Sequence, residues 1–160
     1  ARMPDNTSTW YTTNDATFEI TGVQLEVGDT ATDFEHRSFA QELALCQRYC
    51  QVFSYPTTYD YITDGNVNQT NEVELLFPLA STMRTVPSCS ISDITHFRVN
   101  DYLGHDQDAN SFVGIAAGSS SCVRLNFRKA TANMDIGRVG YLNVSASAGG
   151  NCKLTFSSEL

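Results

Sequence analysis

The pattern of apolar and polar residues changes near residue 38. Before it, over residues 18–27, apolar side chains alternate with polar ones on both sides of Gly22. A period of two is typical of a half-buried strand, and a glycine that interrupts it indicates a bulge. The segment is therefore predicted to be a bulged strand. Its apolar residues are Phe18, Ile20, Val23, Leu25 and Val27.

A helix is predicted from Phe39 to Gln51. Ser38 and Gln41 form a capping-box pattern, in which the two side chains satisfy free amides at the helix start. Apolar residues then recur at helical spacing on more than one face, so the helix is expected to pack between domains or between subunits. Packing onto the end of the following β domain is the alternative. The residues expected at this contact are Phe39, Leu43, Leu45, Cys46 and Tyr49.

After Phe53 the pattern is β throughout. Short segments rich in β-branched and aromatic residues are separated by Gly, Asn, Asp, Ser and Pro, which predicts a sandwich or barrel of roughly six to eight strands. Gly149, Gly150 and Asn151 are predicted to form a tight hairpin turn between the last two strands. The segments are Val73–Phe77, Ile94–Val99, Phe112–Ala117, Cys122–Phe127, Val139–Ser147 and Cys152–Phe156.

Composition excludes several partners. The chain has 160 residues, 41% of them hydrophobic, and a net charge of −8 with only two lysines. Such a surface repels phosphate backbones and anionic lipid, so no nucleic-acid binding is expected. No apolar stretch approaches the roughly 18 residues of a membrane span, so no membrane insertion is expected.

Five cysteines, an odd count, are spread over more than one hundred residues. They form neither a dense disulfide framework nor the C-x-x-C pairs of a zinc site. They are expected to be buried, reduced thiols. No metal and no cofactor is expected. The residues are Cys46, Cys50, Cys89, Cys122 and Cys152.

Several segments resemble the junction found in tail fibres and related receptor-binding tail proteins of tailed bacteriophages. The longest match is ITGVQLEVG at residues 20–28, followed by ATDFEHR at 31–37 and ELALCQRY at 42–49. FPLASTMRTVP at 77–87 is similar to the strand and Met-Arg-x-x-Pro turn that open the distal domain of these proteins. The ending LTFSSEL at 154–160 also resembles theirs.

This resemblance implies a domain order and a setting. Residues 1–37 would be the terminal strands of a jelly-roll, carbohydrate-module-like domain, 38–52 a linker helix, and 53–160 a small distal antiparallel β-sandwich. It implies a homotrimer with three helices near the axis, joined to upstream fibre or tail proteins. The chain would be the carboxy-terminal region of a longer virion protein, assembled in the cytoplasm of a bacterial host.

Catalysis is not expected, and no catalytic residue is assigned. The chain has no G-x-S-x-G elbow, and residues 118–122 read as a flexible turn before a strand. A glycosidase needs two facing carboxylates, and the acidic residues are numerous enough to leave a glycan-degrading, tailspike-type enzyme as an alternative. Short loops disfavour the deep cleft that such chemistry uses.

The segment 98–111 is the strongest candidate for receptor binding. Sugars are held by an aromatic ring under the pyranose and by carboxylates or amides on its hydroxyls. A solvated hairpin loop without a ligand is the alternative. The spacing Asp-x-Asp-x-Asn opens like a calcium loop, but Ser111 and Ala117 stand where such a loop needs Gly and Glu. The candidate residues are Tyr102, His105, Asp106, Asp108 and Asn110.

A second candidate surface is the tyrosine-rich segment 55–66. Exposed tyrosines make adaptable binding faces, and Tyr55 and Tyr59 are assigned to receptor binding on this ground. Packing of Tyr59 and Tyr61 along a strand is the alternative. Three N-x-S/T triplets, at Asn6, Asn68 and Asn143, keep open the alternative of a glycosylated, secreted lectin.

The resemblance, together with the candidate binding segments, implies a phage fibre tip that binds a bacterial surface receptor, in particular a glycan, without hydrolysing it. Three weak sites on one axis would gain strength from avidity. The rival hypothesis is a purely structural module that trimerises and caps the fibre without touching the receptor.

Overall fold

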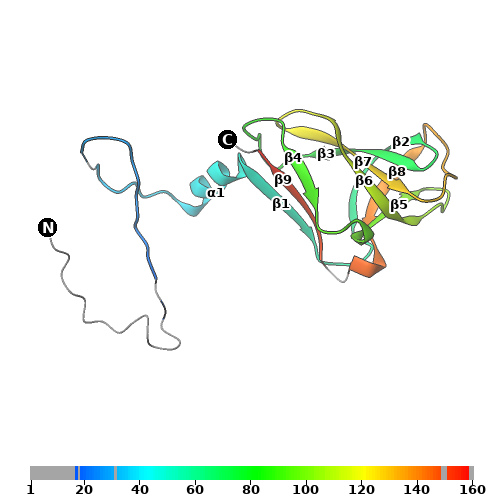
Figure 1. Cartoon of the computed structure of the whole chain (residues 1–160), viewed down its shortest axis with the longest axis horizontal. Helices are drawn as coiled ribbons and strands as arrows, with labels where there is room; N and C mark the ends of the chain where they lie inside the picture. Colours follow the sequence, from blue (N-terminus) through cyan, green and yellow to red (C-terminus); the bar gives the residue numbers. More distant parts are fainter. Residues whose placement is uncertain (1–16, 18, 31, 149–150, 159–160) are drawn as a thin grey trace. The chain divides into compact units, whose positions relative to one another are not determined.

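The computed structural model describes residue 17 and residues 19–30, 32–148 and 151–158. It divides the chain into two compact units, residues 1–37 and residues 38–160. In the described part of the second unit, strands dominate and one α-helix precedes them (Figure 1). The prediction of a mostly β protein with one short helix is confirmed.

The predicted strand over residues 18–27 is wrong for its described part. Phe18 lies outside the described residues, and 19–27 contain no strand. A strand needs a neighbour for its backbone hydrogen bonds, and the described part of the first unit contains no other strand. The expected irregularity at Gly22 is present, since its φ is +67°.

Side chains, rather than strand pairing, organise the described residues of the first unit. The Glu26 carboxylate accepts hydrogen bonds from the Thr32 amide at 2.6 Å and from the Thr32 hydroxyl at 2.7 Å. These bonds lower the pKa of Glu26. Gln24 accepts from the Glu35 amide at 2.8 Å. The apolar side chains remain exposed: Ile20, Val23, Leu25 and Val27.

Helix α1, Phe39–Gln47, begins where the capping box predicts. The Gln41 amide donates to the Ser38 hydroxyl at 3.3 Å, and the Ser38 amide donates to Gln41 Oε1 at 2.9 Å. The predicted extension to residue 51 is wrong. Cys50 and Gln51 instead open strand β1, where they pair with the last strand of the chain.

Two antiparallel sheets follow. The smaller has the order β1-β9-β4, and the larger is a closed barrel of the order β2-β3-β7-β6-β5-β8. The smaller sheet comprises β1 (Cys50–Tyr55), β9 (Cys152–Ser157) and β4 (Ser88–Ile91). The barrel comprises β2 (Tyr61–Gln69), β3 (Glu72–Pro78), β7 (Cys122–Lys129), β6 (Gln107–Gly118), β5 (Phe97–Asp101) and β8 (Val139–Val144).

One core joins the two sheets. Phe53 of β1 meets Phe77 of β3 edge-to-face with ring centroids 4.9 Å apart, and Phe156 of β9 lies 5.2 Å from Phe77. Inside the barrel, Phe127 lies 5.0 Å from Phe97. Buried aromatic side chains contribute most of the apolar area in such a core, and each pair adds roughly 1 kcal/mol beyond burial.

Several element boundaries differ from the predictions. The predicted strand 94–99 begins instead as a short 3-10 helix, η2 (Ile94–His96), because the Asp93 carboxylate caps it through the Thr95 amide at 2.8 Å. The predicted strand 139–147 ends at Val144 and is followed by a second short helix, η3 (Ala146–Ala148).

The predicted hairpin at residues 149–151 is wrong in its pairing. Strand β8 pairs with β2 and β5, whereas β9 pairs with β1 and β4. The two strands therefore lie in different sheets. Gly149 and Gly150 themselves are outside the described residues.

Candidate functional site

The outer face of the barrel over β2, β8 and β5 carries the candidate site. Tyr141 lies in the middle of this face, because β8 pairs with β2 on one side and with β5 on the other. Its register partners are Asp64 and Asn100. Side chains alternate along a strand, so Leu142 is buried in the core and Tyr141 points outward.

Three tyrosines form an aromatic strip across this face. The Tyr61 and Tyr141 rings are stacked with centroids 6.2 Å apart, and the Tyr102 and Tyr141 rings lie 5.3 Å apart. Tyr61 is 54% exposed and Tyr102 is 74% exposed. Partial burial, together with a hydrogen bond to Asp64, raises the pKa of Tyr61 to about 12. Its hydroxyl is therefore protonated at neutral pH.

The turn that carries Tyr102 is held from beneath by Asp101. The Asp101 carboxylate accepts from the Leu103 amide at 2.9 Å and from the His105 amide at 3.0 Å, and it lies 2.8 Å from His105 Nδ1. Its side chain is only 1% exposed. Burial opposes ionisation, but the hydrogen bonds from His105 and Leu103 outweigh it, and the pKa of Asp101 is lowered.

A buried lysine supports the same turn. Lys129, at the end of β7, donates to the His105 carbonyl and, at 2.7 Å, to Asn133 Oδ1. Burial lowers the pKa of Lys129, while Asp101 and Asp106 act in the opposite direction. The turn is thus tied to β5 through a carboxylate and to β7 through an ammonium group, so Tyr102 is presented on a rigid base.

Beside the strip lies a charged row made by Arg98, Asp106 and Asp108. Arg98 Nε donates to Asp106 Oδ2 at 3.0 Å, and Arg98 Nη1 lies 3.4 Å from Asp108 Oδ1. Ser145 donates to the same Asp108 oxygen at 2.8 Å. The hydrogen bond from Arg98 lowers the pKa of Asp106. Both carboxylates are thus paired with the same guanidinium.

The predicted receptor residues fall into three groups. Tyr102 is in the aromatic strip, and Asp106 and Asp108 form the charged row beside it. The His105 ring hydrogen-bonds to the buried Asp101, so His105 helps to hold the turn in place. Asn110 is exposed on β6, away from the turn.

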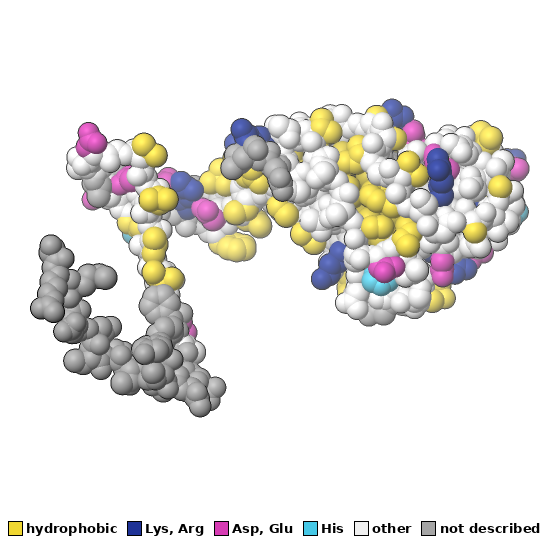
Figure 2. Space-filling view, viewed as in Figure 1, with side chains coloured by type: hydrophobic (Ala, Val, Ile, Leu, Met, Phe, Trp, Pro, Cys, Tyr) yellow, Lys and Arg dark blue, Asp and Glu magenta, His cyan; other side chains and the backbone are white. Residues whose placement is uncertain are grey.

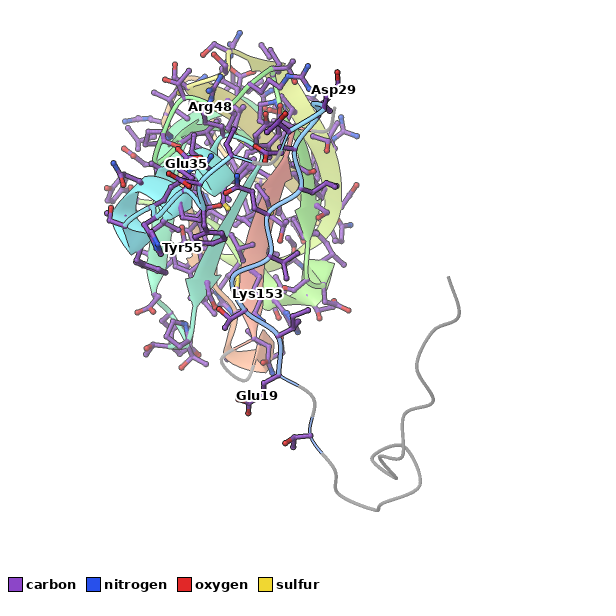
Figure 3. The ribbon with its side chains drawn as sticks, turned by 90° about the vertical axis from the view of Figure 1, so that its left-hand side faces the viewer. Glu19, Asp29, Glu35, Arg48, Tyr55 and Lys153 are labelled. Carbon is purple, nitrogen blue, oxygen red and sulfur yellow. The ribbon has the colours of Figure 1, made fainter. Side chains whose placement is uncertain are left out.

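The two tyrosines that were predicted from segment 55–66 to bind the receptor lie in different parts of the fold. Tyr59 precedes β2 with a φ of 64°, is exposed, and its carbonyl accepts from Asn143 at 3.4 Å on the candidate face. Tyr55 lies on β1 of the three-stranded sheet, next to β9 with Lys153 (Figure 3). It packs against the core, and burial followed by the nearby Cys152 raises its pKa to about 12.

Sequence reasoning did not assign Tyr61 and Tyr141 to the site. Tyr61 stands in the tyrosine-rich segment 55–66 and Tyr141 in a strand pattern, and only the register of β2, β8 and β5 brings them beside Tyr102. Tyr141 could have been assigned to the site only if the order of the strands in the barrel had been known.

A shallow hollow of about 160 Å³ opens at one end of the aromatic strip. Its size is well below that of the roughly 300–1,000 Å³ pockets that enclose drug-sized ligands. The wall combines apolar, aromatic, cationic and anionic groups. The lining residues are Asp101, Tyr102, Leu103, Arg138 and Val139.

Helix α1 carries a second exposed apolar surface. No residue of the helix is buried, and Phe39 is 82% exposed. Figure 2 shows hydrophobic side chains gathered over this helix. The residues predicted for subunit or domain packing are all exposed within this single chain: Phe39, Leu43, Leu45, Cys46 and Tyr49.

The cysteines are all free thiols, but the expectation that they are buried is only partly met. Cys152 is buried, and burial raises the pKa of Cys152 and of Cys89 to about 12. Cys46 and Cys50 are exposed because α1 and the start of β1 lie at the surface. Across the described residues, no group of three or more His, Cys, Asp or Glu side chains could hold a metal ion.

Two of the three N-x-S/T triplets lie within the described residues. Asn68 donates to Glu72 Oε1 at 2.7 Å, and Asn143 donates to the Tyr59 carbonyl. Both amide nitrogens are engaged and neither side chain is fully exposed. Asn6 lies outside the described residues.

No family model, no curated protein and no solved structure matches this chain. Within the part of the chain that the structure describes, no helix is both long and apolar enough to cross a membrane.

Proposed function

We propose that this chain is the receptor-binding tip of a bacteriophage tail fibre and that it binds a glycan on the bacterial surface. The aromatic strip of Tyr61, Tyr141 and Tyr102 is the observation that carries the proposal. Rings of this kind stack on the apolar faces of sugars, and Tyr61 and Tyr102 are exposed at the two ends of the strip.

The chemistry around the strip supports sugar binding. Hydroxyl groups of a sugar need both donors and acceptors, and the charged row offers a guanidinium and two carboxylates beside the rings. The turn below Tyr102 is fixed by Asp101 and Lys129, so little ordering is needed when a ligand arrives.

The same geometry supports binding without hydrolysis. A retaining or inverting glycosidase holds one carboxylic acid at a raised pKa as the proton donor. Asp106 has a lowered pKa and is bound to Arg98, and Asp101 is buried and fully hydrogen-bonded. The hollow is also too shallow to enclose a distorted sugar chain.

Self-association through α1 is the second part of the proposal. Three copies of the helix would cover Phe39, Leu43 and Leu45 around a common axis, in accord with the trimer that the fibre resemblance implies. Trimerisation would place three modest sites on one particle, and linked sites gain about 10²–10⁴ in apparent affinity. The fibre would belong to the virion tail and assemble with upstream tail proteins in the host cytoplasm.

The jelly-roll assignment of residues 1–37 also belongs to this proposal. Four apolar side chains of that unit are exposed in the single chain: Ile20, Val23, Leu25 and Val27. On this account they form the face that further strands of the jelly roll cover. The rival function, a trimerisation cap without receptor contact, is favoured by the exposed face of α1 alone and leaves the aromatic strip without a role.

The test is binding to cells. Fluorescently labelled chain is added to a panel of candidate host bacteria before and after enzymatic or chemical removal of surface polysaccharide. Saturable binding that is lost on stripping supports the glycan-binding tip. A folded, self-associated chain that binds none of the strains, stripped or not, would favour the structural cap.

A further inference from the structure

We propose that the hollow at the end of the aromatic strip binds an acidic sugar residue, and that the Arg138 guanidinium contacts its carboxylate. The inference rests on the proposed glycan-binding function and adds the class of sugar. It assigns Arg138 and Tyr102 to one subsite, with the arginine as the anion contact and the ring as the stacking surface.

Arg138 differs from the three arginines on the barrel strands in having no ion pair. Arg124 binds Glu74 at 2.7 Å, Arg128 binds the buried Glu72, and Arg98 binds Asp106 and Asp108. Arg138 is exposed, and no acidic side chain of the described residues lies within ion-pair distance of it.

The one carboxylate in the wall of the hollow, Asp101, makes no ion pair with Arg138. Both oxygens of Asp101 are occupied, by the Leu103 and His105 amides and by the His105 ring. Asp101 keeps its charge, but its oxygens are committed to the turn, which leaves the Arg138 guanidinium available to an anion from outside the chain. Guanidinium groups bind carboxylates in a planar, two-bond arrangement that suits a sugar acid.

The backbone that carries Arg138 is fixed. The Val67 amide donates to the Arg138 carbonyl at 2.9 Å, and the Gly137 amide donates to the Val67 carbonyl at 2.8 Å. Gly137 has a φ of 85°, a conformation that glycine adopts without strain. Burial of Met134 anchors the same connection against the barrel. The backbone that carries Arg138 is therefore held in place beside the hollow.

The remaining walls match the rest of a sugar ring. Tyr102, Leu103 and Val139 present exposed apolar surface around the guanidinium. A pyranose acid has an apolar ring face on one side and a carboxylate at its edge, and the hollow offers one group for each. Its volume of about 160 Å³ suits a single residue of a chain that continues along the aromatic strip.

Net charge does not oppose this pairing at close range. The chain carries −8 overall, which repels a polyanion at a distance. At physiological ionic strength such effects are screened beyond about 8 Å, whereas a direct contact between guanidinium and carboxylate is screened much less.

The test compares acidic oligosaccharides with their carboxyl-reduced counterparts. The probes contain glucuronic, galacturonic or N-acetylneuraminic acid, and reduction converts each carboxylate into a neutral hydroxymethyl group. For at least one probe, the wild-type chain is expected to bind the acidic form about tenfold more tightly, because a charge-assisted pair is lost on reduction. Arg138→Gln should bind both forms equally, and Arg138→Lys should keep part of the preference.

Arg84→Gln is the matched control, since it removes the same charge from an exposed arginine outside the hollow. It should leave the preference intact. Equal binding of acidic and reduced forms by the wild type overturns the inference, and so does failure to bind any acidic probe. If Tyr102→Ala still weakens binding of neutral oligosaccharides or of cells, the proposed glycan-binding function stands even though the inference about an acidic sugar fails. Loss of all cell binding by the wild type removes both.

Discussion

Helix α1 and the aromatic strip both expose large apolar side chains, but they differ in what surrounds them. Around Tyr61, Tyr141 and Tyr102 the structure places charged groups whose positions are fixed by hydrogen bonds. Along α1, the exposed side chains of Phe39 and Leu43 belong to an apolar surface on a helix that buries none of its residues. A surface that mixes rings with oriented polar groups suits a sugar, whereas a purely apolar helix face suits another apolar helix.

Exposure alone therefore does not identify a binding site. Burial of the α1 face would be driven by apolar area and would be insensitive to fine geometry. Binding at the strip depends on where the hydrogen-bonding groups lie, so it should be sensitive to single changes in the supporting turn. The two surfaces can therefore be disrupted separately.

Replacing Phe39 and Leu43 with Asp should have the largest effect. Two charges on the proposed helix interface should abolish self-association, because burying unpaired carboxylates costs several kcal/mol each. Apparent affinity for cells should then fall by about 10²-fold or more through loss of avidity. Analytical ultracentrifugation and cell binding measure the two effects.

A matched variant, Val86→Asp, adds a charge at another exposed apolar residue of the same unit. It should leave the association state unchanged. If the helix variant remains fully associated, the placement of α1 at a subunit interface is wrong.

Asp101→Asn should be the next largest change and should be confined to the barrel. The buried carboxylate ties three groups of the turn, and its replacement should lower the free energy of unfolding by about 2 kcal/mol. Self-association through α1 should persist. Urea denaturation monitored by circular dichroism measures the decrease in the free energy of unfolding. Asp135→Asn, which changes an exposed carboxylate, is the control.

The contribution of Asp101 should also depend on pH. Its pKa is lowered in the folded state, so its stabilisation is fully present above the unfolded value of about 3.9. Stabilisation should be lost as the pH falls through the lower folded value. The difference in stability between wild type and Asp101→Asn should therefore shrink below about pH 4. A difference that stays constant down to acid pH would contradict the assigned role.

Tyr102→Ala should have the smallest effect on the fold and a clear effect on binding. Tyr102 is largely exposed, so the free energy of unfolding should change by less than about 0.5 kcal/mol. Loss of one stacking ring should weaken monovalent glycan binding about threefold to tenfold. Tyr59→Ala, which removes an exposed tyrosine outside the strip, should weaken glycan binding less. Equal losses of affinity in the two variants would contradict the assignment of the site to the aromatic strip.

The elements that local chemistry determines were predictable from the sequence. The start of α1 follows from Ser38 and Gln41, which lie three residues apart and cap the helix in the structure. The end of α1 was not predictable, because Cys50 and Gln51 are drawn into β1 by pairing with Ser157 and Phe156 more than one hundred residues later.

The candidate site shows the same division. Tyr102 stands in a loop whose composition is suggestive by itself. Tyr141 and Arg138 become neighbours of Tyr102 only through the barrel closure, which places β8 between β2 and β5. Strand order depends on long-range packing, and no spacing along the chain contains it.

The central claim is that the aromatic strip binds the receptor glycan. Isothermal titration with polysaccharide from a bound host strain would compare the wild type with Tyr102→Ala combined with Tyr141→Ala, at matched association state and folded content. We predict saturable heat for the wild type and none for the double variant. Equal heats from two folded proteins would contradict the claim.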